Sequence, residues 1–221
     1  MKQLRFWFDV ISPYAYLAFE RLPQALEGFS VDVRYQPVLF AGLLSHWGQK
    51  GPAEIGPKRD WTYRQVSWLA HRHGIPMQRP AQHPFNPLAL LRLGVACGGP
   101  LGTPGRWACE QLLRHVWQGG GADANDPARL AELAGRLRPA LDPHGDAVKA
   151  ALKAATAEAA ALGIFGVPTV EVDGRLFWGL DGLELLRGYL AGDPWFDGPD
   201  WDEAARQPQG VQRPAGITAK T

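Results

Sequence analysis

The most constraining feature of the sequence is a short apolar run that ends abruptly at the start of a helix. The run Leu4–Ile11 is aromatic and β-branched, which is typical of a buried strand. It breaks at Ser12–Ala15, where a serine N-cap and a proline in the first turn favour a helix that continues to about Leu26. Alternation from Phe29 to Val38 predicts a second strand, so the chain begins with a right-handed βαβ unit.

Length, charge and apolar runs narrow the class of protein. A chain of 221 residues accommodates one domain, or one domain with a large insertion. The net charge of +1 gives no electrostatic case for binding nucleic acid or an anionic membrane. No run approaches the roughly 18 apolar residues of a membrane span, and the N-terminus lacks the pattern of a signal peptide. We therefore expect a cytoplasmic protein that binds neither nucleic acid nor membranes.

The cysteines and histidines argue against metal and dithiol chemistry. Cys97 and Cys109 form no Cys-x-x-Cys pair, which excludes a dithiol redox centre and a zinc knuckle. We expect two small buried apolar residues in a reducing compartment, with a disulfide between them left open. His71 and His73 are two apart on a predicted helix and face different directions, so we expect no metal site there.

Helical patterns separated by Pro and Gly clusters fill residues 39–145, and α/β patterns return after them. An Ala-rich helix, Ala147–Leu162, precedes two strands joined by an Asp-Gly turn, which is a strong hairpin signal. These elements are the strands 167–172 and 175–178 and a last helix, 182–190. The order βαβ, helices, αββα indicates an α/β protein, a thioredoxin-like fold with a large all-helical domain inserted after the second strand.

This interpretation fixes the expected domains and the expected site. The predicted parts are a thioredoxin-like domain (1–38 and 146–196), an inserted helical domain (39–145) and a flexible tail (197–221). In thioredoxin-fold oxidoreductases the first strand leads into a Cys-Pro-x-Cys box on a helix N-terminus. Here Ser12 and Ala15 stand at the two cysteine positions. Without the cysteines, the site retains a hydroxyl and the positive end of a helix. Both stabilise a negative charge, so the site suits a thiolate that belongs to a ligand.

A second motif supports this site. Gly163–Thr169 lies where a thioredoxin fold carries a cis-proline facing the first box. A cis bond between Val167 and Pro168 turns the backbone of Val167 toward an extended, peptide-like ligand. The alternative, a plain Gly-x-Pro strand entry, is about equally supported by this segment alone. The pairing with Ser12 favours the functional interpretation.

The motifs carry a specific resemblance. Phe8–Ala18 resembles the N-terminal motif of 2-hydroxychromene-2-carboxylate isomerases and kappa-class glutathione transferases, which are relatives of the disulfide oxidoreductase DsbA. Further matches follow in family order at Trp47–Pro52, Pro57–Arg59, Gly74–Pro76, Gly166–Thr169 and Phe177–Asp181. Each match is weak alone, but the ordered set is specific. The resemblance implies glutathione as cofactor, a small-molecule substrate and a homodimer.

The resemblance also implies roles for particular residues. Ser12 donates a hydrogen bond to the glutathione sulfur, Val167 before Pro168 pairs with the cysteinyl backbone, and Asp181 binds the γ-glutamyl ammonium. A helix N-terminus and a hydroxyl donor lower the thiol pKa from about 8.5 toward neutrality. The thiolate then adds to an activated alkene and leaves after bond rotation or ring opening, which isomerises the substrate.

Two positions depart from the family pattern. Gln49 stands where the family has an asparagine that contacts glutathione, and Leu180 stands where a serine or glutamine is frequent. The loss of one polar contact is worth about 1–3 kcal/mol if nothing replaces it. These two residues weaken the case for tight glutathione binding.

Five more residues are candidates with an ordinary alternative. Lys58 and Arg59 neutralise a carboxylate of glutathione or substrate, or they form a solvated helix start. Tyr14 and Trp178 contact a bound aromatic substrate, or they pack in the core. His83, before a Pro-rich loop, lies at a pocket edge or, as we favour, is a hydrogen-bonded loop histidine.

The sequence therefore predicts a glutathione-dependent isomerase of an aromatic carboxylate, with Ser12 as the catalytic residue. Two alternatives stay open: a general glutathione transferase of the kappa type, and a non-catalytic thioredoxin-fold binding protein. The departures at Gln49 and Leu180 favour the latter. A thiol–disulfide oxidoreductase would need a reactive cysteine near Ser12, and both cysteines belong to the helical insertion.

Overall fold

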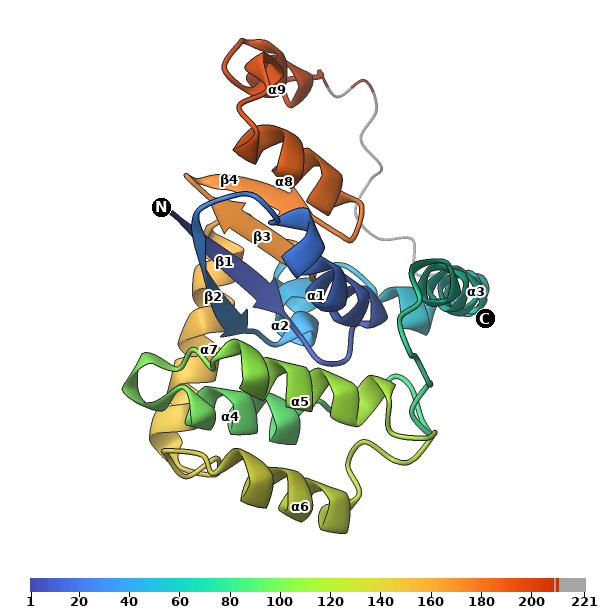
Figure 1. The fold of residues 1–221 in the computed structure, drawn as a ribbon. Helices are drawn as coiled ribbons and strands as arrows, with labels where there is room; N and C mark the ends of the chain where they lie inside the picture. Colours follow the sequence, from blue (N-terminus) through green and yellow to red (C-terminus); the bar gives the residue numbers. More distant parts are fainter. Residues whose placement is uncertain (209, 211–221) are drawn as a thin grey trace.

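A four-stranded mixed sheet lies at the centre of the computed structural model, which describes residues 1–208 and 210 (Figure 1). The strand order is β2-β1-β3-β4. β1 pairs in parallel with β2, whereas β3 pairs antiparallel with both β1 and β4. The strands are β1 (Lys2–Phe8), β2 (Val31–Pro37), β3 (Thr169–Val172) and β4 (Arg175–Trp178). This is the predicted thioredoxin-like arrangement, with the hairpin formed by β3 and β4.

Helices occupy the rest of the described chain and follow the predicted order. They are α1 (Pro13–Ala25), α2 (Phe40–His46), α3 (Gly56–His73), α4 (Leu88–Cys97), α5 (Arg106–Trp117), α6 (Pro127–Leu137), α7 (Asp146–Ala161), α8 (Gly182–Leu190) and α9 (Asp200–Ala204). Short 3-10 turns lie at Pro52–Glu54, Gly99–Leu101 and Pro194–Phe196. Helices therefore fill the predicted insertion between β2 and α7.

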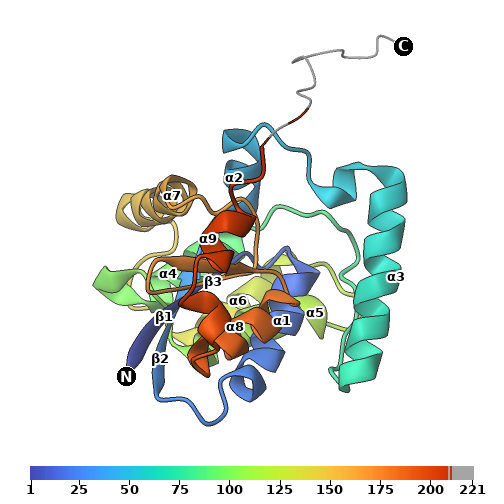
Figure 2. The same ribbon diagram turned by 90° about the horizontal axis from the view of Figure 1, so that it is seen from above.

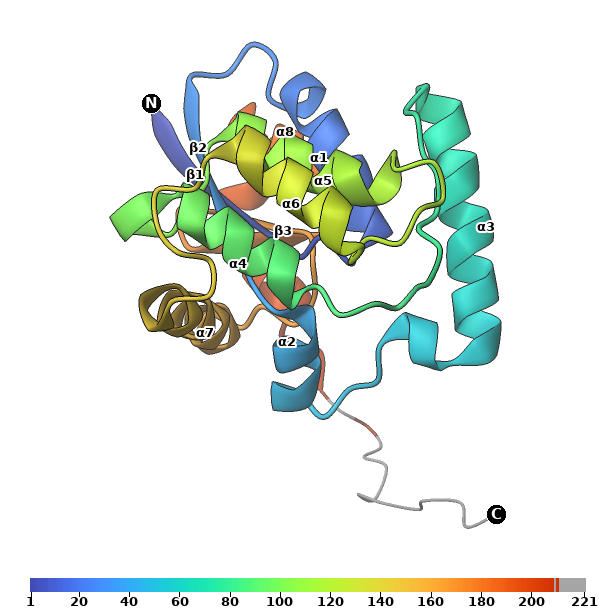
Figure 3. The same ribbon diagram turned by 90° about the horizontal axis from the view of Figure 1, so that it is seen from below.

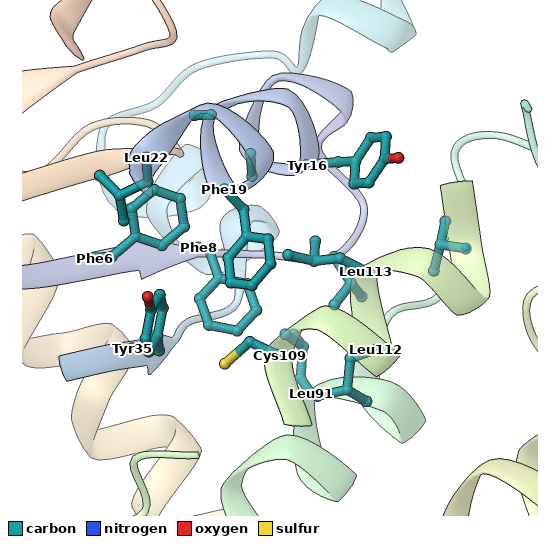
Figure 4. Close-up of a cluster of buried hydrophobic side chains, with 14 of the residues drawn as sticks. Phe6, Phe8, Tyr16, Phe19, Leu22, Tyr35, Leu91, Cys109, Leu112 and Leu113 are labelled. Carbon is teal, nitrogen blue, oxygen red and sulfur yellow. The ribbon is translucent and has the colours of Figure 1, made fainter. Parts of the chain in front are cut away.

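The alternation of side chains along β1 sends apolar groups to both faces of the sheet. Phe6 and Phe8 pack with Phe19 of α1 and with α5 on one face, and Figure 4 shows Phe19 beside Leu113 and Phe6 beside Leu22. Trp7 points to the other face, into a smaller cluster formed with α2 and α7. Both faces of β1 are therefore buried, which explains why its sequence is an almost continuous apolar run.

The helical block shares its core with the sheet. Helices α4, α5 and α6 lie together on one side (Figure 3), and their buried side chains belong to the same cluster as those of β1 and α1. In Figure 2, α3 and α7 lie on opposite sides of the molecule. The boundaries between domains at residues 38 and 146 stay a prediction.

The first strand ends three residues earlier than predicted, at Phe8. Asp9 is the physical reason, because its carboxylate accepts hydrogen bonds from the backbone N–H of Ile11 at 3.0 Å and of Phe40 at 2.9 Å. These bonds take the place of ladder bonds and turn the chain toward α1. The Val167–Pro168 segment likewise precedes β3 instead of starting it, since proline has no N–H for the ladder.

The predicted flexible tail also differs from the structure in its first part. Helix α9 follows Phe196, and the ring of Trp201 lies 5.4 Å from that of Phe196 and 5.7 Å from that of Phe177. The guanidinium of Arg175 lies over the Trp201 ring. Aromatic burial thus orders a segment whose Pro/Gly-rich composition predicted none. Residues 209 and 211–221 of the predicted tail lie outside the described part.

Candidate active site at the start of the first helix

Ser12 is the N-cap of α1, as the sequence predicts. Its backbone is extended, and its Oγ accepts a hydrogen bond from the N–H of Ala15 at 3.2 Å. Pro13 occupies the first turn, where its fixed backbone and missing N–H suit a helix start. The side chain is 7 % exposed. The hydroxyl therefore lies in a sheltered position at the positive end of a 13-residue helix.

The loop that carries Ser12, residues 9–12, is held by groups from three other parts of the chain. Asp9 ties it to the start of α2 through the N–H of Phe40. Trp117 at the end of α5 donates from Nε1 to the carbonyl of Val10 at 2.9 Å. His83 bonds the carbonyl of Ile11 at 2.8 Å through its Nε2. The position of Ser12 is thus set by residues far away in the sequence.

Asp9 is completely buried, and its environment is the most perturbed of the site. Burial raises the pKa of its carboxyl to about 7, while the hydrogen bonds from the N–H of Ile11 and Phe40 act in the opposite direction. The carboxyl of Asp9, the first residue of the Ser12 loop, therefore titrates near neutral pH.

The segment before β3 faces Ser12. The Val167–Pro168 peptide bond is cis, and Ser12 Oγ donates to the carbonyl of Val167 at 3.2 Å. The Pro168 carbonyl accepts from the N–H of Gly179 at 2.9 Å, which joins this segment to the end of β4. The structure thus brings Ser12, Val167 and Pro168 together, although 155 positions separate the serine from the valine.

The segment after β4 lies beside the Val167–Pro168 segment, because the N–H of Gly179 bonds the Pro168 carbonyl. Gly166 leaves room for the indole of Trp178. A Cβ at position 166 would lie only 2.6 Å from Trp178 Nε1. Gly179, at φ +89, stands in the same relation to Asp181 Oδ1, at 2.5 Å. Trp178 and Asp181 are both exposed to solvent.

Tyr14 links α1 to α3 and senses the charge of Asp181. Its hydroxyl donates to Gln65 Oε1 at 2.6 Å. Partial burial raises the pKa of Tyr14, a hydrogen bond with Thr62 lowers it, and the negative charge of Asp181 raises it. Tyr14 is half-buried and packs against the edge of the core.

The structure does not bring every predicted residue into contact with Ser12. Gln49 is exposed, and its backbone N–H closes the end of α2 on Leu44. Lys58 and Arg59 are exposed in the first turn of α3, and Arg59 Nε lies 3.6 Å from the carboxylate of its neighbour Asp60. These residues can reach only the outer parts of a ligand.

His83 contacts the Ser12 loop, which the sequence did not indicate. We favoured a loop histidine that is satisfied by its neighbours, and both ring nitrogens are indeed hydrogen-bonded. One of the partners is the Ile11 carbonyl, directly before Ser12. The Pro-rich context of His83 indicated a rigid loop, but nothing local indicated which part of the chain that loop would contact.

The two cysteines are thiols that lie away from the Ser12 loop, on α4 and α5. Burial raises the pKa of Cys97 and raises that of Cys109 well above its ordinary value. A buried thiol with a raised pKa is a poor nucleophile. The residues of the site can hold and polarise a thiolate, but they supply none of their own.

Among residues 1–208 and 210, no group of three or more His, Cys, Asp or Glu side chains is placed to hold a metal ion. The helices of this part of the chain include none that is long and apolar enough to cross a membrane.

Curated relatives cover most of the chain. A 2-hydroxychromene-2-carboxylate isomerase of Sphingobium xenophagum is 29% identical over 86% of this chain and 98% of the relative. An isomerase of the same name from Pseudomonas sp. (strain C18) is 27% identical, with 86% and 90% covered. Glutathione S-transferase kappa 1 of Rattus norvegicus is 27% identical, with 87% and 92% covered. The resemblance seen in the motifs is thus confirmed across the chain.

Comparisons of structure and of family agree. A solved structure of a 2-hydroxychromene-2-carboxylate isomerase superposes with a TM-score of 0.72 at 21% identity, covering 88% of this chain and 97% of the other. This likeness confirms the fold. The family model described as the DSBA-like thioredoxin domain matches residues 3–191, from β1 to the end of α8. This chain, with a serine at the position of the nucleophilic cysteine, belongs to the DSBA-like thioredoxin domain family.

Proposed function

We propose that this protein is a glutathione-dependent isomerase of an aromatic carboxylate similar to 2-hydroxychromene-2-carboxylate. One observation carries the proposal: Ser12 Oγ lies at the N-terminus of α1, 3.2 Å from the Val167 carbonyl, and the chain's own thiols lie elsewhere, on α4 and α5. A site that can stabilise a thiolate but has no cysteine of its own suits a cofactor that carries a thiol. Isomerases and kappa transferases among the curated relatives support the same cofactor.

The binding of glutathione follows from the backbone groups that face Ser12. When the sulfur binds, the Ser12 hydroxyl turns its proton from the Val167 carbonyl to the thiolate. The Val167 carbonyl is then free to accept the cysteinyl N–H of glutathione. In the proposal Asp181, which is exposed, binds the γ-glutamyl ammonium, and Gln49, in the segment after α2, contacts the glutathione peptide.

The proposed reaction needs no further nucleophile. The thiolate attacks the activated alkene, a C–S bond forms, and the displaced electron pair moves to the conjugated carbonyl oxygen as an enolate. A bond that is now single rotates. The enolate then re-forms the alkene, the C–S bond breaks, and glutathione leaves unchanged. Tyr14 and Trp178 contact the aromatic part of the substrate, while Lys58 and Arg59 neutralise its carboxylate.

A kappa-type glutathione transferase is the second candidate, and the kappa relatives favour it. It uses the same bound thiolate, but the C–S bond persists in the product. Incubation with 2-hydroxychromene-2-carboxylate separates the two, since an isomerase returns glutathione stoichiometrically and a transferase consumes it. An electrophile with a leaving group provides the matched transferase assay.

The first experiment is calorimetry of glutathione binding at neutral pH with wild type, Ser12→Ala and Asp181→Ala. We expect binding that Asp181→Ala weakens, together with a thiolate absorbance that Ser12→Ala abolishes. No binding at millimolar glutathione would eliminate both the isomerase and the transferase. The non-catalytic binding protein, which the exposed Gln49 and the apolar Leu180 favour, would then be the better interpretation.

Two further properties belong to the proposal. The free thiols of Cys97 and Cys109 support a cytoplasmic, reducing location.

Trp61 and Trp68, seven residues apart on one face of α3, are 62% and 56% exposed, and this supports a homodimer that covers them. Analytical ultracentrifugation tests the dimer, and a Trp68→Glu variant tests this face.

A further inference from the structure

The peptide unit that leads into Ser12 is held at both ends. Its N–H belongs to Ser12 and donates to the carbonyl of Asp9 at 3.1 Å. Its carbonyl belongs to Ile11 and lies 2.8 Å from His83 Nε2. Because a peptide unit is planar, fixing its two polar ends fixes the direction in which the next Cα, and hence the Ser12 side chain, projects.

The hydrogen bonds place one proton on the His83 ring. The carbonyl of Ile11 only accepts, so Nε2 carries a proton. Nδ1 is hydrogen-bonded with the hydroxyl of Tyr63 on α3, at 2.8 Å, and the same hydroxyl lies 3.1 Å from the His83 carbonyl. Burial lowers the pKa of His83, although the bond to Ile11 acts against this, and a lowered pKa keeps the ring in the neutral form.

The ring of His83 is also confined on its faces. Trp117 lies 5.5 Å away between ring centroids, and Phe85 lies 6.2 Å away. Trp117 itself holds the Val10 carbonyl, one residue before the peptide unit that His83 holds. The imidazole therefore has one orientation, with Nε2 aimed at the Ser12 loop and Nδ1 aimed at α3.

We propose that His83 is a positioning residue that aims the Ser12 hydroxyl and the first turn of α1 at the bound sulfur. The aim of Ser12 Oγ depends on the Ile11–Ser12 peptide, and His83 is the side chain that holds its carbonyl. The Tyr63 hydroxyl supports the tautomer, so α3 takes part in positioning a serine that it does not touch. The inference deepens the proposed function and rests on it for the identity of the sulfur.

A thiol placed at position 12 reports this positioning without glutathione. In Ser12→Cys, the sulfur takes the place of the hydroxyl, and its pKa reads the electrostatic field of the helix start. Ultraviolet titration measures that pKa, and subtraction of the wild-type titration removes the contributions of Cys97 and Cys109. The variants added to this background are His83→Phe, His83→Gln, Tyr63→Phe and Phe85→Leu.

We expect His83→Phe to raise the thiol pKa by about half a unit or more, since the loop loses the bond that orients it. His83→Gln retains an N–H donor near the position of Nε2, so it should restore the original pKa. Tyr63→Phe should give a smaller rise. Phe85→Leu reduces packing without removing a hydrogen bond, so it should lower the melting temperature and leave the pKa unchanged.

An unchanged thiol pKa in His83→Phe, with a lowered melting temperature, would overturn the inference and leave His83 with a structural role. Failure of His83→Gln to restore the pKa would overturn it as well. A parallel titration of glutathione bound to proteins that keep Ser12 tests the proposed function separately. If wild type shows no glutathione thiolate, the proposed function is contradicted. An effect of His83→Phe on the pKa of the thiol at position 12 would still support the positioning role of His83.

Discussion

The inner and the outer parts of the site are built differently. The Ser12 loop is buried. Side chains from α5 and from the loop before α4 hold two of its carbonyls, and the Asp9 side chain accepts from the backbone N–H of Phe40 in α2. The outer residues, Gln49, Lys58 and Asp181, are exposed. The part proposed to polarise sulfur is therefore held by buried hydrogen bonds, while the part proposed to recognise the rest of the ligand consists of solvated side chains.

This difference indicates which positions of the site can be substituted at a small cost in free energy. A substitution at the outer residues removes one contact among several, and water replaces part of it. A substitution in the buried loop leaves polar groups without partners in a place that water cannot reach. The departures from the family pattern at Gln49 and Leu180 lie outside the Ser12 loop, as this comparison leads one to expect.

The largest expected effect comes from Ser12→Gly. Turnover should fall by about 100- to 1000-fold, the typical consequence of removing one donor to a developing or full negative charge. Glycine is an acceptable N-cap, but the buried Val167 carbonyl loses its donor, so stability should fall by about 1–3 kcal/mol. Steady-state kinetics and thermal unfolding measure the two effects. Turnover that survives within twofold would remove Ser12 from the mechanism.

The next effect concerns Asp9 and pH. A carboxyl whose pKa rises from 3.8 to about 7 on folding stabilises the fold below pH 3.8, and this stabilisation is lost as the pH rises through 7. Between about pH 5 and about pH 8, wild type should lose on the order of 2 kcal/mol relative to Asp9→Asn. Urea unfolding at both pH values measures this difference. The histidines titrate in both proteins and cancel, so parallel stabilities would contradict the raised pKa.

A smaller effect is expected at the rim from Asp181→Asn. The variant keeps the shape and loses the charge, so glutathione affinity should fall by about tenfold, the size of one charge-assisted hydrogen bond. The pKa of the bound thiol should stay unchanged, because the Ser12 loop is intact. Calorimetry and thiolate absorbance on one sample separate affinity from polarisation. A shifted thiol pKa would mean that the inner and outer parts are coupled.

The smallest effect is expected from Lys58→Ala. The side chain is exposed in the first turn of α3, so substrate affinity should fall by about twofold, and the difference should shrink at high salt. Glu184→Ala, an exposed charge on α8, is the matched control. Salt titrations of KM measure both. A salt-independent loss of tenfold or more would place Lys58 within the buried part of the site.

The sequence by itself determined the elements and the local chemistry. The apolar run that breaks at Ser12 and Pro13 predicted a strand followed by a capped helix, because capping and the proline backbone act between near neighbours. The Asp173–Gly174 turn predicted the hairpin for the same reason, since its positive backbone angles, φ 51 and φ 76, suit these residues.

Only the tertiary structure decided how the Ser12 loop is held. Asp9 looked like the end of a strand, yet it also caps the approach to α2, and His83 looked like a loop residue, yet it bonds the Ile11 carbonyl across 72 positions. Such bonds depend on how distant elements pack, which neither spacing nor propensity records. The packing of Trp201 against Phe177 and Phe196, which ordered a segment predicted to be flexible, has the same origin.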